Sequence, residues 1–437
     1  MTDRRDPIEA WLSADVDLMS PPPGAFERVH RRARHRKAMK ALTAAAGAAV
    51  VIAGGVVIPQ IVGVLGTNNH PVPLKVRTMT PAPRPTGPAP KVAIPGPPLS
   101  TAPAGPPPAG GFEPTSVTFI GTNVGVVLGV AGSCATSSCT AMAATHDYGR
   151  TWSEMAAPPA GPADGKKGVS QVRFLGYKNG WAYGPALYAT HNGGKSWRAI
   201  FTHGGRVIDL STVGHRAFAV VGFGCTGAGA RYATGCTRFT LFSAAAASNE
   251  WDAVTKASGT GGAIAGALQL TGKHGYLLAG GRLYAGPVRK GAWHRVSPAR
   301  VPGCIRPGAS GPQLIAPAPA ASELFLVCLN SATSMLTLYQ SPSTGSSWQR
   351  RGVVQAAGVA QSLAVTPSGS LVLATTTGIY RSADGRTWNP VFTRPAGGFS
   401  FIGMTTDTQG VAVAASLGRD VYITTDGGNT WQARPIR

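Results

Sequence analysis

The chain has 437 residues, with 40 Lys and Arg against 18 Asp and Glu, which gives a formal net charge of +22. A basic surface favours anionic partners such as wall polymers, acidic glycans and lipid headgroups, although charge also serves solubility. No motif that interleaves aromatic and basic residues is visible, so nucleic acid is not expected as a partner. The abundance of Ala, Gly, Pro and Arg suggests a GC-rich bacterial genome and fits a protein that faces a cell wall.

Residues 1–40 form a short polar segment with too few apolar residues for a domain. Ile8, Trp11 and Leu12 have the spacing of one helical face. The segment ends in a basic run from Arg28 to Lys40. We interpret 1–40 as a cytoplasmic tail whose charges set the membrane topology; a cytoplasmic partner bound through Trp11 is the alternative.

Residues 41–66 contain no charged side chain. About 20 apolar residues are enough to span a bilayer, and the basic run lies directly before this segment. By the positive-inside rule, the sequence predicts a single transmembrane helix with a cytoplasmic N-terminus and an extracytoplasmic C-terminal part. A cleaved signal peptide is the alternative, but its apolar core is usually shorter and its leader is not normally 40 residues long.

Residues 67–112 are dense in Pro, together with Ala, Gly and Thr. Such a composition favours extended polyproline II and acts as a semi-rigid spacer. We interpret the segment as an extracytoplasmic stalk that suits a domain reaching through a cell-wall layer. An unconstrained linker would have the same composition.

The remaining chain, 113–437, is organised by a repeated turn that ends in a tryptophan. Its clearest copy runs from Thr424 to Trp431 and reads TTDGGNTW. Asp accepts hydrogen bonds from nearby backbone amides, Gly accepts a positive φ, and Trp is a large apolar anchor for the gap between two sheets. The copies that keep some or all of this chemistry have their key residues at Asp147 and Trp152, Asn192 and Trp197, Trp348, Asp384 and Trp388, and Asp426 and Trp431.

Two weaker copies keep only the tryptophans Trp251 and Trp293, so that seven tryptophans recur every 40–55 residues. This is the period of four-stranded propeller blades. The turns resemble Asp-box (BNR) repeats, S/T-x-D-x-G-x-x-W, which occur in sialidases, sortilin-type receptors, some glucan hydrolases and propellers of the photosystem II assembly-factor type. The resemblance implies an all-β, seven-bladed β-propeller over 113–437, with each box between the third and fourth strands of a blade.

Short alternating or apolar runs between Gly, Asn, Ser and Pro clusters predict the strands themselves. In blade one they are Ser116 to Gly121, Val124 to Val130, Ala141 to Thr145, and the strand of Trp152. Trp181, in the second strand of blade two, is expected to be a packing residue. The sequence leaves the closure of the ring open, and the alternating run 74–79 is a candidate for an extra strand.

All six Cys follow the apolar segment, which indicates disulfides in an oxidising compartment. Six Cys allow 15 connectivities, so the pairing is inferred from the positions of the Cys among the blades. A zinc site is the alternative, but no His lies among these Cys at ligand spacing, and no metal or other cofactor is expected. The predicted pairs are Cys134–Cys139, Cys225–Cys236 and Cys304–Cys328.

Residues 1–40 hold nine basic and six acidic residues, so the rest of the chain carries a net charge of +19. In a propeller, the turns after strands one and three share one face, and those after strands two and four share the other. The second face has the longer loops, and we take it as the candidate binding face for a protein or an anionic wall polymer. Its basic residues are Lys166, Lys167, Arg231, Arg300, Arg306 and Arg394.

A sialidase-like glycoside hydrolase is the alternative to a binding module. Sialidases carry an early F/Y-R-I-P motif, and the nearest string here, Cys304 to Pro307, lacks its aromatic residue. A glycosidase needs two acids about 5–10 Å apart, and Asp209, Glu323 and Asp407 are the candidates for convergence near a central channel. The sequence therefore favours a single-pass membrane protein with an extracytoplasmic binding or scaffold propeller, and no catalytic residue is assigned.

Overall fold

The structure is a computed structural model that describes residues 111–436 apart from 132–139, 164–166, 227–235, 261–266, 280–281, 290, 297–311, 319–322, 331–332, 334, 356–357, 394–396 and 417. Within these ranges no helix is long and apolar enough to cross a membrane. The predicted tail, the predicted transmembrane helix and nearly all of the predicted stalk, residues 1–110, lie outside them, as does the candidate strand at 74–79.

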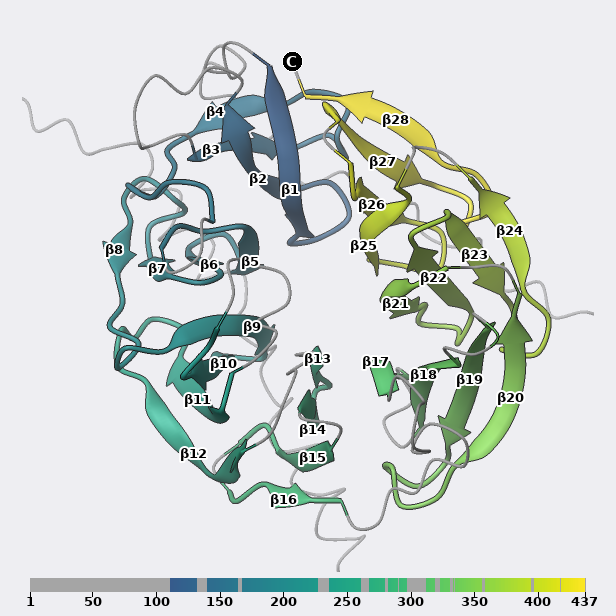
Figure 1. Cartoon of the computed structure of the whole chain (residues 1–437). Coiled ribbons are helices and arrows are strands. Elements are labelled where there is room, and N and C mark those ends of the chain that lie inside the picture. The colour runs from purple at the N-terminus through teal and green to yellow at the C-terminus, as the bar shows by residue number, and fades with distance from the viewer. Residues whose placement is uncertain are drawn as a thin grey trace, which may run out of the picture. The chain divides into compact units, whose positions relative to one another are not determined.

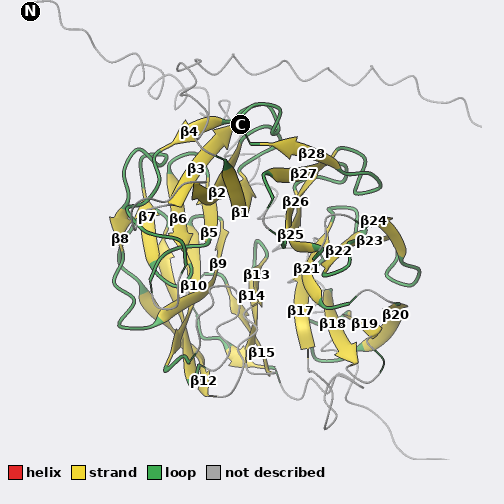
Figure 2. Cartoon of the chain, turned by 45° about the horizontal axis from the view of Figure 1, so that its top comes forward, coloured by secondary structure: helices red, strands yellow, loops and turns green. Residues whose placement is uncertain are grey.

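The described chain forms seven four-stranded antiparallel sheets, each built from four consecutive strands. Figures 1 and 2 show the sheets arranged as blades around a central axis, with the first strand of each blade innermost. This arrangement confirms the predicted all-β, seven-bladed β-propeller.

Each blade contains four strands that follow one another directly in the chain. Blades one to four consist of β1 (Phe112–Phe119), β2 (Gly125–Ala131), β3 (Thr140–Thr145) and β4 (Ser153–Met155); β5 (Gln171–Leu175), β6 (Asn179–Tyr183), β7 (Leu187–Thr190) and β8 (Arg198–Ala199); β9 (Arg206–Val213), β10 (Arg216–Phe223), β11 (Arg238–Ala245) and β12 (Asp252–Thr260); and β13 (Ala267–Leu270), β14 (His274–Ala279), β15 (Arg282–Pro287) and β16 (His294–Arg295). Blades five to seven consist of β17 (Pro312–Pro317), β18 (Leu324–Asn330), β19 (Met335–Ser341) and β20 (Gln349–Val354); β21 (Ala360–Val365), β22 (Leu371–Thr375), β23 (Ile379–Ser382) and β24 (Asn389–Phe392); and β25 (Phe399–Met404), β26 (Gly410–Ala414), β27 (Asp420–Thr424) and β28 (Gln432–Pro435).

The hydrophobic core of the ring is divided into seven clusters, and each cluster lies between two neighbouring blades. One of the seven repeated tryptophans packs in each cluster, against the blade that precedes it in the ring. Four of them are largely buried, because burial of an indole ring between two sheets removes a large apolar area from water. From blade one to blade seven they are Trp152, Trp197, Trp251, Trp293, Trp348, Trp388 and Trp431.

The ring closes by side-chain packing between the first and last blades. Phe112 of β1 and Trp152 share a core cluster with Val413 of β26 and Ile423 of β27. In addition, the Tyr148 hydroxyl lies 3.0 Å from the carbonyl oxygen of Gly410 and 2.8 Å from that of Thr424. All four strands of the last sheet come from the C-terminal part of the chain, so closure in the described residues does not depend on a strand exchanged between the two ends.

The predicted Cys225–Cys236 disulfide is present and joins the two ends of the loop between β10 and β11. Cys328 of β18 is also disulfide-bonded. Its predicted partner Cys304 lies outside the described residues, as does the predicted pair Cys134–Cys139. Trp181 is fully buried in β6 and meets Trp251 edge-to-face, as expected of a packing residue.

Candidate functional site

Five of the seven links between a third and a fourth strand share one geometry, and we refer to them as tryptophan turns: residues 145–152, 190–197, 341–348, 382–388 and 424–431. In the last of them, one carboxylate oxygen of Asp426 accepts hydrogen bonds from the Thr424 hydroxyl at 2.8 Å and the Thr430 amide at 2.9 Å. The other oxygen accepts the Thr430 hydroxyl at 2.7 Å. Partial burial raises the pKa of Asp426, but these hydrogen bonds outweigh it, so the pKa lies below its ordinary value.

The other tryptophan turns repeat this geometry with different side chains. Asp147 accepts the amide and the hydroxyl of Thr151, at 2.9 and 2.6 Å. Asn192 accepts the Ser196 amide at 3.0 Å with its oxygen and donates to the Ser196 hydroxyl with its nitrogen at 2.8 Å. In blade six, Asp384 accepts the Arg386 amide at 2.9 Å. The turn therefore tolerates Asn for Asp, because both offer an oxygen at the same place.

The glycine before the tryptophan connects each of these turns to the neighbouring blade. All five glycines have φ between +75° and +94°, the region that glycine adopts most easily. A Cβ at Gly149 would lie 2.5 Å from Ile423 of blade seven, and one at Gly345 would lie 2.6 Å from Leu283 of blade four. The polar side chains named above bond within their own turns, and the glycines pack against the neighbouring blade, so we interpret the tryptophan turns as structural elements of the ring.

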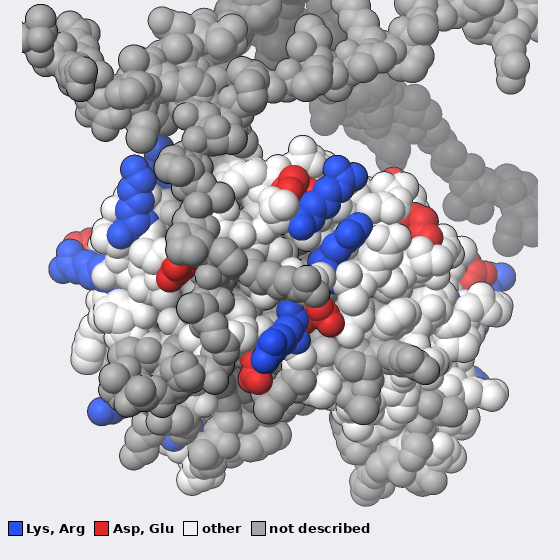
Figure 3. Space-filling view, turned by 90° about the horizontal axis from the view of Figure 1, so that it is seen from above, with Lys and Arg blue, Asp and Glu red and all other residues white. Residues whose placement is uncertain are grey.

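The basic face predicted from the sequence falls largely outside the described residues. Lys167 is described and its side chain is exposed. The other five basic residues lie outside those ranges: Lys166, Arg231, Arg300, Arg306 and Arg394. On the side of the ring that carries β4 and β28, Lys and Arg side chains are interspersed with Asp and Glu in the described surface (Figure 3).

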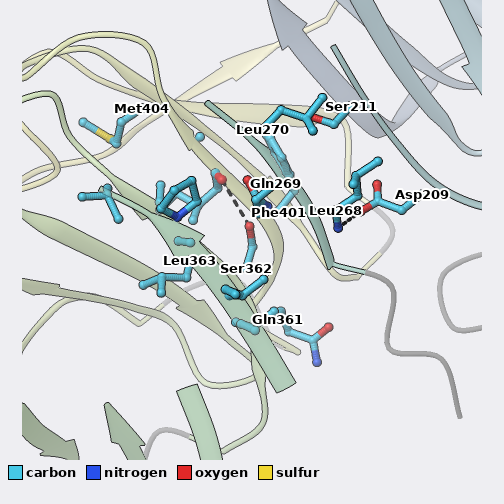
Figure 4. Close-up of a pocket in the computed structure, with 18 of the residues that line it drawn as sticks. Asp209, Ser211, Leu268, Gln269, Leu270, Gln361, Ser362, Leu363, Phe401 and Met404 are labelled. Atoms are coloured by element: carbon cyan, nitrogen blue, oxygen red, sulfur yellow. Dashed lines mark hydrogen bonds between the residues drawn. The ribbon is translucent and has the colours of Figure 1, made fainter. Parts of the chain in front are cut away.

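The structure does contain a cavity of about 410 Å³ at the centre of the ring. Six of the seven innermost strands line it, namely β5, β9, β13, β17, β21 and β25. Its walls combine apolar side chains with a group of polar ones. The polar side chains are those of Arg173, Asp209, Ser211, Gln269, Gln361 and Ser362, most of which are drawn in Figure 4.

Asp209, on β9, is the carboxylate of this cavity. Its oxygens accept the Leu268 amide of the next blade and the Leu210 amide, both at 2.8 Å. Burial raises the pKa of Asp209 to about 6, against the lowering effects of the Leu268 amide, the Arg173 charge, the Leu210 amide and the Tyr183 hydroxyl. The side chain therefore changes its charge at mildly acidic pH while it joins two blades.

Arg173, on β5, is the cation of the cavity. Its guanidinium donates one hydrogen bond to the carbonyl oxygen of Val172 at 2.8 Å. The guanidinium carbon also lies 5.2 Å from the ring centre of Phe401, which belongs to blade seven. This is a cation–π distance, so the aromatic ring supports the guanidinium from one side and leaves further N–H donors for other acceptors.

The three acids proposed from the sequence do not converge. Glu323 accepts a hydrogen bond from Gln340 at 3.0 Å, and Asp407 is exposed and accepts the Ser368 amide at 2.6 Å. Only Asp209 of the three lines the central cavity. Glu323 directly precedes β18 and Asp407 lies in the loop between β25 and β26, so neither joins Asp209 in the described lining of the cavity.

A β-bulge aims several of the central polar side chains. The pairing of the first strand with the second shifts by one residue in β1, β9, β17, β21 and β25. In three of these strands, the residue directly after the bulge makes a hydrogen bond to the first strand of the next blade. These residues are Ser116, which accepts the Val172 amide; Asp209, which accepts the Leu268 amide; and Ser362, which donates to the Ile402 carbonyl.

Sequence reasoning missed Arg173, Gln269 and Phe401 as cavity residues. The available signal was a polar residue between two apolar residues of a short strand, as in Val172-Arg173-Phe174 and Leu268-Gln269-Leu270. β5 and β13 keep this alternation, whereas bulges shift it by one residue in the other five first strands, so alternation gives no common rule for the central positions.

No protein-family model matches this chain, and no curated protein matches it. Among solved structures, YCF48 from Cyanidioschyzon merolae is similar with a TM-score of 0.51 at 15% identity, over 74% of this chain and 98% of that chain. A structure of YCF48 bound to a D1 peptide has a TM-score of 0.49 at 17% identity, over 76% of this chain and 95% of that chain. The first of these similarities shows the fold: the protein is a β-propeller.

Proposed function

We propose that this protein is an extracytoplasmic, membrane-anchored binding module whose propeller holds a protein or an anionic polymer of the cell envelope. The observation that carries the proposal is the central cavity, where Arg173 offers a positive charge and Asp209 is the one acidic side chain among neutral polar and apolar residues of the described lining. The predicted basic loop face, with Lys167 at its described part, is a second region for contact with the same class of partner. We also assign the tryptophan turns to the Asp-box type.

Three features support the location. Residues 41–66 lack charged side chains and follow a basic run, which favours an anchor with a cytoplasmic N-terminus. The Pro-rich segment 67–112 suits a stalk. The Cys225–Cys236 disulfide fits an oxidising compartment. A protease added outside intact cells should remove the mass of the propeller, and protection of that mass would reverse the proposed orientation.

Glycoside hydrolysis, the alternative function, fits the cavity less well. Two carboxyl groups are needed across a scissile bond, about 5–10 Å apart. In the described lining of the cavity, Asp209 is the single carboxylate, and the Leu210 and Leu268 amides bind its two oxygens. A cavity with a single carboxylate of this kind is better suited to holding a ligand than to cleaving a glycosidic bond.

The binding function is tested with the purified full chain in detergent. We expect it to retain isolated envelope polymer, or a defined protein cross-linked to it in the native host, and a chain lacking 113–437 should lose that capture. If the protein instead releases sugar from a panel of glycosides, glycoside hydrolysis is its function and the binding proposal is wrong. A combined replacement of Lys166, Lys167, Arg300 and Arg306 by Ser tests the loop face, which has no role if the partner is recovered unchanged.

A further inference from the structure

We propose that the central cavity is a carboxylate-binding site in which Arg173 contacts the ligand's anionic group and Asp209 takes up a proton when the ligand binds. The inference rests on the proposed binding function and names the chemical group that the cavity recognises. The ligand is a monocarboxylate carried on an apolar or neutral polar body, because the described lining offers one cation and, apart from Asp209, only uncharged side chains.

Arg173 has donors to spare. A guanidinium has five N–H donors, and the hydrogen bond to the Val172 carbonyl occupies one of them. Its charge also lowers the pKa of Asp209, which is the charged neighbour of Arg173 in the described lining. Arginine binds carboxylates through two parallel N–H···O hydrogen bonds, so the guanidinium of Arg173 can bind a ligand carboxylate in this way.

Phe401 fixes the position of this cation. Its ring lies against the guanidinium at 5.2 Å, and it comes from blade seven, two blades away from β5 in the ring. A guanidinium held by an aromatic face loses less side-chain entropy when a ligand binds, and preorganisation of this type raises affinity. The same ring supplies an apolar surface for the body of the ligand.

Neutral polar groups complete the site. The side chains of Ser211 and Gln269 line the cavity, and neither forms a hydrogen bond to another described residue. Both can donate to a carboxylate or bind the hydroxyl and amide groups of a ligand body. Because these two side chains are not used in hydrogen bonds within the described fold, both are available to bind a polar ligand.

The charge on Asp209 competes with the ligand for Arg173. The titratable or charged groups that face Asp209 are Arg173 from β5 and Tyr183 from β6, and the other described side chains that line the cavity are uncharged. A second carboxylate placed beside Arg173 repels the ionised form of Asp209, so the ligand binds more tightly when Asp209 is protonated. The raised pKa of Asp209, about 6, puts this change at mildly acidic pH.

The site is tested by calorimetry on the full chain with two matched pairs of probes. One pair is a hexuronate disaccharide and the corresponding neutral hexose disaccharide; the other is an N-acetyl dipeptide and its C-terminal amide. We expect at least one acid to bind, at least tenfold more tightly than its neutral counterpart. The pair that shows the difference identifies whether the carboxylate comes from a sugar or from a peptide.

Arg173→Gln should weaken that acid at least tenfold, and Arg173→Lys should weaken it less. Lys178→Gln, at an exposed cation in the turn between β5 and β6 and outside the cavity, is the matched control and should leave the affinity unchanged. Far-UV circular dichroism and the melting temperature verify that each variant is folded. Equal binding of acid and neutral probes, or unchanged affinity in folded Arg173→Gln, would overturn the proposal.

The role of the proton is tested by repeating the titration at pH 5 and pH 7.5. The wild-type protein should bind the acid several-fold more tightly at pH 5, and Asp209→Asn should show equal affinities at the two pH values. A wild-type affinity independent of pH would overturn the role of Asp209.

Retention of envelope polymer, or of the cross-linked protein, distinguishes failure of the carboxylate site from failure of the proposed binding function. If folded Arg173→Gln retains it as the wild type does, the carboxylate site fails and the binding function stands, whereas a wild-type chain that retains nothing removes the binding function itself.

Discussion

The tryptophan turns and the central cavity use similar polar residues for different purposes. In the turn of blade seven, Asp426 binds the amide and hydroxyl of Thr430, four residues further along the chain. In the centre, Asp209 binds the amide of Leu268, 59 residues away in the next blade. The first carboxylate therefore shapes a local turn, whereas the second joins two blades beside a cavity.

This difference separates stability from ligand binding. The carboxylate of a tryptophan turn has a pKa below its ordinary value, because hydrogen bonds stabilise its charge. The carboxylate of the centre has a raised pKa, because burial outweighs the same kind of hydrogen bond. Changes in the turns should therefore act on the fold, and changes in the centre should act on charge and ligands.

The largest effect is expected from Trp431→Ala in the outer part of the ring. Trp431 is 6% exposed and packs between blades six and seven, and truncation of a buried aromatic side chain costs about 3–5 kcal/mol. Urea unfolding measures the loss. Trp388→Ala, at a partly exposed tryptophan of the same kind, should lose less, and equal losses would contradict the role of burial.

The next effect is a pH dependence that arises in the centre. The folded pKa of Asp209 is about 6 against an ordinary value of 3.8, so the folded protein holds this proton more tightly than the unfolded chain does. The free energy of unfolding should therefore fall as the pH rises from about 4 to about 6, by up to about 3 kcal/mol at roughly 1.4 kcal/mol per pKa unit.

Urea unfolding at pH 4.5 and pH 7 of the wild type and of Asp209→Asn measures this contribution. The other carboxylates contribute equally to both proteins, so the difference between the two slopes isolates Asp209. Wild-type and variant stabilities that run parallel between these pH values would contradict the assignment.

A smaller effect is expected from Gly149→Ala, which tests the contact between a tryptophan turn and the preceding blade. The substitution costs about 1–2 kcal/mol for the left-handed conformation, and the new Cβ also meets Ile423 at 2.5 Å. Gly369→Ala is the control, because its φ is +95° and its Cβ would meet no atom within 4 Å. If the two variants have the same midpoint of unfolding, the contact contributes nothing.

The smallest effect is expected from Asp426, the cap of the last tryptophan turn. Asp426→Ala should cost about 1 kcal/mol, as does the loss of a comparable capping side chain. Asp426→Asn should lower the free energy of unfolding by only a few tenths of a kcal/mol, since Asn192 already makes the same turn in blade two. The two variants are compared by their melting temperatures, and a large loss in the Asn variant would show that the charge itself is needed.

The sequence by itself determined the seven blades, because each blade carries its own tryptophan and its own third-to-fourth-strand link. These features depend on contacts within about eight residues, so the letters at Thr424–Trp431 are enough to predict the turn. The Cys225–Cys236 disulfide, 11 residues apart, was predictable for the same reason.

The tertiary structure decided how the ring closes and what lies at its centre. Tyr148 meets Gly410 and Thr424 across more than 260 residues of sequence, and no local pattern contains that contact. Likewise, Arg173, Asp209 and Phe401 face one cavity only because three separate blades place their first strands around one axis, and bulges turn two of these strands by one residue. A polar residue in a short strand looks the same in the sequence whether it faces water or a cavity, and the neighbours that distinguish the two cases come from distant blades.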